Sequence, residues 1–267
     1  DLYRIIGVFD SNSHGVSGTE MVKLIRVRTL GGASWGVYNT SNTSGTYSGF
    51  ANDWTGKSTT SKANLNVLLN EYFYNKMSTS STYGDCANWT YFISGGGYTT
   101  KDCSDIIAYG IDSSLRGYIE NATWYLYGSS TDQSKQNWYL CERGGNSCTT
   151  SGPNTGDASV TSKMGLMYIS DYLYANGYYS STDTTIGKLY YGNKNWLFKG
   201  RGECTQTPYA SNSYNVWNVD SANVHPSPSD NSCDWRPTFY LKSSVYVTGG
   251  NGSFDNPYTI ACDNCTE

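Results

Sequence analysis

Eight cysteines restrict the fold of this 267-residue chain more than any other feature of its sequence. An even number of cysteines is typical of proteins that fold in an oxidising compartment, where thiols form disulfides. The connectivity is open, and the simplest pairing joins the cysteines in sequence order. Each bond would then close a short loop, and closing a loop of about 15 residues contributes about 3 kcal/mol in the chain-entropy model. The predicted bonds are Cys86–Cys103, Cys141–Cys148, Cys204–Cys233 and Cys262–Cys265.

A metal site is the alternative use of cysteine, and the spacing argues against it. Only Cys262 and Cys265 form a C-x-x-C pair, and the two histidines, His14 and His225, lie far from it in the sequence. Asp and Asn residues are abundant, but no run matches an alternating Asp/Asn calcium loop closed by Glu. We therefore predict no metal site and no cofactor, and leave only calcium open.

The composition indicates a folded chain with polar loops. Hydrophobic residues make up 37% and charged residues 15%, and the chain contains 29 Gly, 25 Tyr and 8 Trp. Disordered chains are poor in aromatic residues, so this composition favours a folded domain. The net charge is −4 and the isoelectric point is near 5.2. Since no run of Lys or Arg is present, we expect no nucleic-acid partner.

The sequence also bears on where the protein works. No apolar stretch approaches the roughly 20 residues of a membrane helix, so we expect no direct membrane insertion by this segment. No signal peptide is visible. Together with the cysteines, this suggests an ectodomain whose export or anchoring segment has been removed. The expected location is extracellular or at the cell surface.

Hydrophobic patterns predict helices and strands in mixed order. Residues 5–9 and 21–27 suggest a β-hairpin, because a Ser/Gly/Asn region separates two apolar runs. Residues 61–77 have helical periodicity, and residues 112–122 suggest a second helix with a cap at its first or second residue. No repeat or linker stands out, so a single α+β domain over residues 1–267 is expected. Further strands are predicted at residues 123–127, 137–140, 163–168, 195–198, 214–219 and 238–247.

Several side chains are assigned to the core. Aromatic residues scattered through the polar stretch 31–60 are expected to pin it to the core, and these are Trp35, Tyr38, Tyr47, Phe50 and Trp54. The inward faces of the two predicted helices are Leu65, Leu68, Leu69, Tyr72 and Phe73 in the first, and Leu115, Tyr118 and Ile119 in the second. Arg236, between a Trp and a Pro, is expected to hydrogen-bond backbone or a carboxylate inside the fold.

The carboxyl-terminal third resembles one branch of the C-type-lectin-like fold. The stretches NWLF at 195–198, SNSYNVW at 211–217 and WRPTFYL at 235–241 follow one another in the order of that branch. The branch contains formylglycine-generating-enzyme-like domains and the variable proteins of diversity-generating retroelements. The opening residues 2–9 and the later stretches 236–243, 249–252 and 256–258 are similar to exported surface proteins of gut Firmicutes and Mollicutes.

The resemblance spans nearly the whole chain and has structural consequences. It implies a C-type-lectin-like fold with two helices, short antiparallel strands and long disulfide-stapled loops. Many of the similar exported proteins look pilin-like at their amino terminus, so the resemblance also implies a position on a pilus or at a surface tip.

Residues 212–232 are the candidate binding region. Their sequence, NSYNVWNVDSANVHPSPSDNS, consists largely of residue types that adenine-directed mutagenesis of Asn codons produces in the retroelement family. Ordinary loops are also rich in Asn, Ser and Pro, so both explanations stand. Tyr and Trp give rigid contact area, and Ser and Asn give adaptable hydrogen bonds. The predicted ligand-binding residues are Tyr214, Trp217, Asn218, Asp220, Asn223, His225, Ser227, Ser229 and Asn231.

Two points about this region stay open at the level of sequence. Alternation along residues 214–219 does not decide which face meets solvent. Trp217 and Trp235 are also explained by burial in the core, and for Trp235 we favour that interpretation. A Cys204–Cys233 bond would bracket the whole segment 212–232.

The sequence assembles no recognisable catalytic site, so we predict that the protein is not an enzyme. Formylglycine generation requires a redox-active cysteine pair, whereas Cys233 has Cys204 as its expected structural partner and acidic neighbours. Neither histidine lies near a nucleophile elbow. Glycoside hydrolysis needs two carboxylates about 5–10 Å apart. Nothing in the sequence pairs the candidates Glu142, Asp171 and Asp220.

These features predict an extracellular, adhesin-like ligand-binding domain displayed on a bacterial surface or pilus. The expected partner is a protein or glycan on another cell or a phage, contacted through the carboxyl-terminal loop region. Two further hypotheses stay open. The chain could be a structural subunit of a pilus or surface filament that associates with copies of itself. It could also be a glycan-binding lectin whose aromatic rings stack on sugars.

Overall fold

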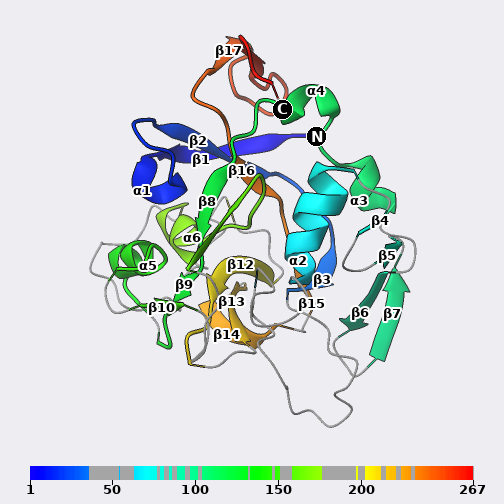
Figure 1. The fold of residues 1–267 in the computed structure, drawn as a ribbon, viewed down its shortest axis with the longest axis vertical. Helices are drawn as coiled ribbons and strands as arrows, with labels where there is room; N and C mark the ends of the chain where they lie inside the picture. The colour runs from blue at the N-terminus through cyan, green and yellow to red at the C-terminus, as the bar shows by residue number, and fades with distance from the viewer. Residues whose placement is uncertain are drawn as a thin grey trace.

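The computed structural model is an α+β fold in which short helices lie among small, mostly antiparallel sheets (Figure 1). This confirms the predicted α+β class. The structure describes residues 1–35, 54, 63–76, 79–80, 84–85, 89–93, 97–101, 104–131, 133–145, 148–150, 158–175, 197, 202–211, 215–220, 224–229 and 232–266.

The amino-terminal hairpin forms as predicted, because a turn separates two apolar runs. β1 (Tyr3–Phe9) pairs antiparallel with β2 (Met21–Arg26). β16 (Thr238–Tyr240) pairs with the other edge of β2, so β2 is the central strand. The first, third and fifth side chains of β2 are all buried, and one of them is Lys23.

The connection between β1 and β2 depends on a glycine. The chain forms the single-turn helix α1 (Ser11–His14) and then reverses at Gly15, whose φ is +72°. A Cβ atom on Gly15 would lie 2.2 Å from the Oγ1 of Thr123, so a side chain is excluded by space as well as by backbone conformation. Gly18 has the same φ of +72° but open space around it.

The segment predicted as a helix at residues 61–77 is helical from residue 64 to residue 74. α2 (Asn64–Val67) continues directly into a π-helical stretch, η1 (Leu68–Tyr74). Periodicity did not predict the wider π turns, because a stripe of apolar residues is compatible with either geometry over so few turns. The predicted inward stripe is confirmed, since all five of its side chains are buried: Leu65, Leu68, Leu69, Tyr72 and Phe73.

The second predicted helix, at residues 112–122, is much shorter in the structure. α4 covers only Ser113–Arg116, and it follows another short helix, α3 (Ser104–Ala108). Asp112 is the cap, because its side chain accepts a hydrogen bond from the N–H of Ser114 at 2.9 Å. The prediction therefore placed the start of the helix correctly and its end wrongly.

Tertiary pairing explains the early end of α4. Ile119 forms an isolated β-bridge with Leu241, which requires extended backbone at that point. Ile119 is buried as predicted, and Tyr118 packs against the core from a partly buried position. The inward orientation predicted for Leu115 is wrong, since this residue is 45% exposed.

The prediction of a strand at residues 137–140 is also wrong. These residues belong to the helix α5 (Lys135–Cys141), whose amino end is capped by the Ser134 hydroxyl through a 3.2 Å hydrogen bond. Trp138 and Cys141, one helical turn apart, are both buried. Capping and the packing of this face override the strand preference of the aromatic residues in the segment.

Other predicted strands are shifted or divided. Residues 163–168 form a single bridge at Gly165 rather than a strand. They follow β11 (Ser159–Ser162), which pairs antiparallel with β8 (Ala122–Tyr125). The segment 123–127 divides between β8 and β9 (Tyr127–Gly128). Residues 238–247 divide between β16 and β17 (Val245–Gly249). Of residues 195–198, only Leu197 lies within the described part.

The largest sheet in the described part contains the carboxyl-terminal strands. β13 confirms the strand predicted at residues 214–219 as far as these residues are described. β12 and β15 run parallel, and the other neighbours run antiparallel. The strand order is β14 (Val224–Pro228), β13 (Asn215–Val219), β12 (Glu203–Pro208), β15 (Ser232–Asp234) and β3 (Gly32–Ser34).

The middle strand of this sheet, β12, is polar and yet fully buried. Thr205 donates its hydroxyl to the carbonyl of Trp217 at 2.6 Å, and Gln206 accepts the N–H of Leu166 at 2.9 Å. Burying polar groups is tolerable only when they are hydrogen-bonded. The strand is therefore fitted to its neighbours by hydrogen bonds rather than by an apolar face.

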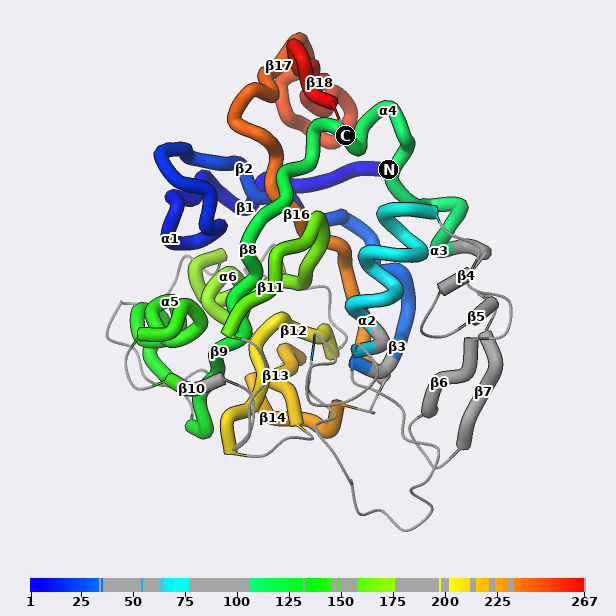
Figure 2. The backbone as a smooth tube through the Cα atoms, in the orientation of Figure 1, coloured from blue at the N-terminus to red at the C-terminus, as the bar shows by residue number. Residues whose placement is uncertain are grey.

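Small two-stranded units and one more helix complete the described part. The β17–β18 hairpin stands at the end of the molecule where both ends of this chain also lie (Figure 2). The elements are β4 (Thr79–Ser80) with β5 (Gly84–Asp85), β6 (Trp89–Ile93) with β7 (Gly97–Lys101), β9 with β10 (Thr149–Thr150), β17 with β18 (Thr259–Cys262), and α6 (Ile169–Ala175).

Three of the four predicted disulfides are confirmed. Cys204–Cys233 joins the parallel strands β12 and β15, with the Cα atoms 5.4 Å apart. Cys141–Cys148 and Cys262–Cys265 have Cα separations of 5.1 and 5.6 Å. The predicted Cys86–Cys103 bond lies outside the described residues.

The core is unusually aromatic, which accounts for part of the Tyr and Trp content. Trp35 and Trp54 are buried against each other with ring centroids 5.1 Å apart, so these two do pin the polar stretch to the core. Trp235 is buried as favoured from the sequence. The other aromatics of that stretch, Tyr38, Tyr47 and Phe50, lie outside the described residues.

Candidate functional site

The described part of the region predicted to bind a ligand lies on β13, on β14 and next to the ends of these strands. Six of the nine predicted residues are described, and Tyr214, Asn223 and Asn231 lie outside the described part. The six divide by burial. Four are buried, and these are Trp217, Asn218, Ser227 and Ser229.

Trp217 faces the core rather than solvent. Its side chain is 3% exposed, and its Nε1–H donates to the carbonyl of Ser129 at 2.9 Å. The ring makes edge contacts with Trp138 and Tyr209, at centroid distances of 5.1 and 5.4 Å. Both faces of β13 are covered, so strand alternation alone could not assign this ring to a surface. Its large contact area stabilises the fold.

Among the six described candidates, Asp220 and His225 have accessible side chains, and the two form a pair. The Nδ1 of His225 lies 3.4 Å from the Oδ2 of Asp220, and their side chains are 42% and 35% exposed. β13 ends one residue before Asp220, and His225 lies in β14, so the hairpin brings them together. This pair is an accessible polar contact point on the hairpin.

A pocket of about 420 Å³ lies elsewhere, at the carboxyl end of β2. Its volume falls in the range of roughly 300–1,000 Å³ that small-ligand sites occupy. Four distant segments build it: the first two residues, the end of β2, α3 and the loop before β18. Its lining residues are Asp1, Leu2, Arg26, Val27, Arg28, Thr29, Leu30, Ile106, Tyr109 and Phe254.

Arg26 organises the floor of this pocket. Its guanidinium binds the carboxylate of Asp1 through Nε at 2.8 Å and Nη2 at 3.0 Å. Its Nη1 donates to the carbonyls of Arg28 and Thr29 at 2.8 and 3.1 Å. Burial lowers the pKa of Arg26, and its tyrosine neighbours oppose that shift. This bidentate, four-bonded arginine is a rigid element that fixes the turn after β2.

The rim of the pocket carries exposed rings. Tyr109 is 53% exposed, and its ring centroid lies 5.3 Å from the Cζ of Arg26. Phe254, in the loop between β17 and β18, is 71% exposed. Arg28 is the exposed cation of the lining. The pocket therefore combines flat apolar faces with fixed charged and carbonyl groups.

Sequence analysis missed this pocket. Its residues are contributed by segments that are far apart along the chain, and none belongs to a motif. The alternation Arg26-Val27-Arg28 at the end of a strand was the only local signal. Such a signal does not say which aromatic residues will meet the arginines.

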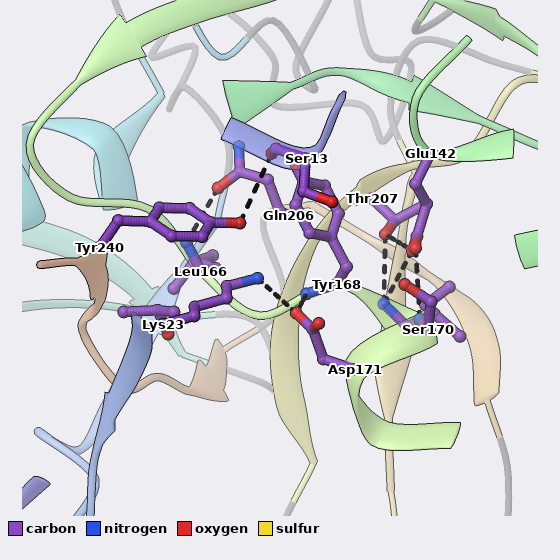
Figure 3. Close-up of polar contacts among 12 residues, drawn as sticks. Ser13, Lys23, Glu142, Leu166, Tyr168, Ser170, Asp171, Gln206, Thr207 and Tyr240 are labelled. Carbon is purple, nitrogen blue, oxygen red and sulfur yellow. Dashed lines mark hydrogen bonds and ion pairs between the residues drawn. The ribbon is translucent and has the colours of Figure 1, made fainter. Parts of the chain in front are cut away.

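Two of the three candidate carboxylates lie close to one another in the interior (Figure 3). Asp171 pairs with Lys23 through Oδ2 at 2.5 Å. Glu142 accepts the N–H groups of Ile169 and Ser170 at 2.8 and 3.2 Å, and it also accepts the Thr207 hydroxyl. Burial raises the pKa of Glu142, and these hydrogen bonds oppose that shift. The third candidate, Asp220, lies on the β13–β14 hairpin.

A second buried ion pair involves Arg236 of the WRPTFYL stretch. Arg236 donates to the Oε2 of Glu203 through Nε at 2.9 Å and Nη2 at 2.6 Å, and to the carbonyl of Leu197 at 2.5 Å. The Tyr172 hydroxyl donates to the same Oε2 at 2.7 Å. This confirms the prediction that Arg236 bonds a carboxylate and backbone inside the fold.

The remaining sequence candidates for chemistry have structural partners. His14 is buried, with Nε2 3.0 Å from the carbonyl of Phe9 and Nδ1 3.2 Å from the N–H of Val16. Cys233 is bonded to Cys204. Among the described residues, no group of three or more His, Cys, Asp or Glu side chains is arranged to hold a metal ion.

Comparison with known proteins identifies no relative. No family model, no curated protein and no solved structure matches the chain. In the described part of the chain, no helix has the length and apolarity needed to cross a bilayer.

Proposed function

We propose that this chain is an extracellular, adhesin-like ligand-binding domain and that its ligand is a glycan held at the pocket beside Arg26. The observation that carries the proposal is the combination of Tyr109, Phe254 and Arg28 around one concave site. The three described disulfides support an oxidising, extracytoplasmic location.

The chemistry of the pocket fits a sugar better than an apolar molecule. Sugar rings have C–H faces that stack on aromatic rings, and hydroxyl groups that need fixed donors and acceptors. Tyr109 and Phe254 supply exposed rings, while Asp1 and Arg28 supply charged groups at the same site. Arg28 favours a glycan that carries a carboxylate, because a guanidinium binds carboxylates in bidentate geometry.

The wider biological setting is part of the same proposal. The residues that resemble the C-type-lectin-like fold and its exported bacterial members suggest display on a surface or pilus. A glycan on another cell is then the natural partner of the pocket. The β13–β14 hairpin, with Asp220 and His225 accessible, is a second contact surface within this proposal.

A glycan array followed by calorimetric titration tests the proposal. Tyr109→Ala and Phe254→Ala should each weaken binding about tenfold or more, since losing a central aromatic contact commonly costs above about 1.4 kcal/mol. Tyr174→Ala is the matched control, because Tyr174 is 50% exposed and does not line the pocket. The affinity of Tyr174→Ala for the glycan should equal that of the protein without substitutions.

Two results would overturn parts of the proposal. Absence of binding across a broad array that includes acidic glycans would reject the glycan. If Asp220→Asn or His225→Ala abolished binding while the pocket variants bound normally, the site would be the hairpin instead.

A structural role in a filament is the second candidate, and exposed apolar side chains favour it. Tyr246, Val247 and Tyr258 are exposed on or beside the β17–β18 hairpin, and the loop of this hairpin carries the exposed Phe254. Exposed aromatic clusters are typical of surfaces that meet another protein. Sedimentation equilibrium over a wide concentration range distinguishes this role, because a filament subunit should associate and a monomeric lectin should not.

A further inference from the structure

Lys23 occupies an unusual position for a lysine. It lies in the central strand β2, on the buried face, and its side chain has no exposure to solvent. Fully buried lysines are rare, and burying an ammonium group is unfavourable unless it is paired. Its Nζ lies 2.5 Å from the Oδ2 of Asp171, whose side chain is also buried (Figure 3).

Aromatic rings enclose this pair. The Nζ of Lys23 lies 4.7 Å from the ring centroid of Tyr168 and 5.5 Å from those of Phe9, Trp124 and Tyr240. Such a shell excludes water, and removing water disfavours the charged ammonium form of a lysine. Burial lowers the pKa of Lys23, Asp171 opposes that shift, and the positive charge of Arg143 adds to it. A neutral lysine amine is a nucleophile.

The geometry places this nucleophile beside an electrophilic carbon. Because Oδ2 is bonded to Cγ at about 1.2–1.3 Å, Nζ lies within about 3.8 Å of the Cγ of Asp171, near the attack distance of roughly 3–3.5 Å. The N–H of Tyr168 donates to Oδ2 at 3.0 Å, so this hydrogen bond holds the carboxyl group in place beside Nζ. Groups fixed in this way react as if at very high concentration.

We propose that Lys23 and Asp171 join covalently through an isopeptide bond. The ammonium and carboxylate first exchange a proton, which gives an amine and a carboxylic acid. The amine nitrogen attacks Cγ, a C–N bond forms, the C–OH bond breaks, and the hydroxyl leaves as water with a proton from the nitrogen. The product is an amide and one water molecule, so no oxidant, reductant or cofactor is needed.

Glu142 has a separate role near this site. It accepts hydrogen bonds from Ile169, Ser170 and Thr207, so its carboxylate is occupied in holding the start of α6. It therefore positions the element that carries Asp171. The proton transfers take place within the Lys23–Asp171 pair itself.

The proposed bond would link two residues that are much farther apart in the sequence than the cysteines of any described disulfide. Lys23 and Asp171 are 148 residues apart in sequence, whereas the described disulfides span 7, 29 and 3 residues. An isopeptide bond would tie the amino-terminal hairpin to α6 and close a long loop. It would also resist reducing agents, which disulfides do not.

Intact mass spectrometry of the fully reduced, alkylated protein tests the proposal directly. The mass should be one water molecule lower than the mass of the sequence with all eight cysteines alkylated. A protease digest should contain a branched peptide that includes both Lys23 and Asp171. Lys23→Met and Asp171→Ala should each restore the full mass, and near-ultraviolet circular dichroism checks that they fold. Lys163→Met is the matched control and should keep the loss of water.

If the variants fail to fold, the mass of the protein without substitutions is sufficient to test the proposed bond. A full sequence mass after prolonged incubation would overturn the proposal. So would a loss of water with Lys23 and Asp171 found only in separate linear peptides, because that result would indicate a succinimide elsewhere in the chain. A branched peptide joining the two residues would establish the bond.

Discussion

Replacing Arg236 with leucine should destabilise the protein strongly, because the change leaves a buried carboxylate without its cation. Arg236 and Glu203 have side-chain exposures of 2% and 1%. In Arg236→Leu, Glu203 would keep the Tyr172 hydroxyl at 2.7 Å and lose the two guanidinium hydrogen bonds at 2.9 and 2.6 Å. The carbonyl of Leu197 would lose its donor as well.

The magnitude follows from these losses. Hydrogen bonds to charged groups contribute about 1.5–3 kcal/mol each, and removing one partner of a buried ion pair costs about 3–5 kcal/mol. We expect a loss of about 3–5 kcal/mol in the free energy of unfolding. Equilibrium denaturation in urea with the disulfides intact measures it.

Two further variants make this test specific. The double variant Glu203→Leu with Arg236→Leu should be less destabilised than Arg236→Leu alone, because neither charge of this pair then remains. Arg28→Leu, at an exposed arginine, should change stability by less than about 0.5 kcal/mol. A loss below about 1 kcal/mol for Arg236→Leu, or a double variant as unstable as the single one, would refute the reasoning.

Three other perturbations have signs that the structure determines. Gly15→Ala should lower the free energy of unfolding by about 1–3 kcal/mol more than Gly18→Ala, as measured by urea denaturation. Both glycines have a φ of +72°, and only Gly15 lacks room for a Cβ atom. Equal losses in the two variants would contradict this reasoning. Burial raises the pKa of Tyr3 to about 12. Stability should therefore be retained below pH 10 and fall as pH rises toward about 12, since the unfolded chain releases this proton first. The urea midpoint, measured below and above pH 10, should decrease less in Tyr3→Phe than in the protein without substitutions. An equal decrease in both proteins would contradict the role of Tyr3. Replacing both Cys204 and Cys233 with alanine should lower the free energy of unfolding by about 3–4 kcal/mol, because the bond closes a loop with a separation of 29 residues. A loss below about 1 kcal/mol would be inconsistent with the bond.

Local signals in the sequence predicted part of this fold well. The β1–β2 hairpin and the helix through η1 were predicted because apolar spacing decides both. The sequential disulfides were predicted because nearby cysteines usually meet. The segment at α5 was misassigned because Trp138 and its neighbours favour strands, whereas the Ser134 cap and the burial of one helical face decide the outcome.

The candidate site was less accessible to sequence reasoning. The predicted region contains Trp217, whose ring is buried because both faces of β13 are covered. The pocket needs Arg26, Tyr109 and Phe254 in one place, and only the tertiary fold supplies that arrangement. Long-range contacts therefore determine the site, while short-range patterns determine the elements that carry it.

The buried polar strand β12 has a consequence for how this chain avoids misfolding. Strands usually keep their register through alternating apolar side chains, and such segments can stack into cross-β aggregates. In β12, a slip by one residue would separate Glu203 from Arg236 and Thr205 from its carbonyl partner at the same time. Wrong registers would thus be penalised by several unpaired groups at once. The hydrogen-bonding side chains of β12 therefore specify its register within the sheet. They also disfavour pairing of this strand with the same strand of a second chain.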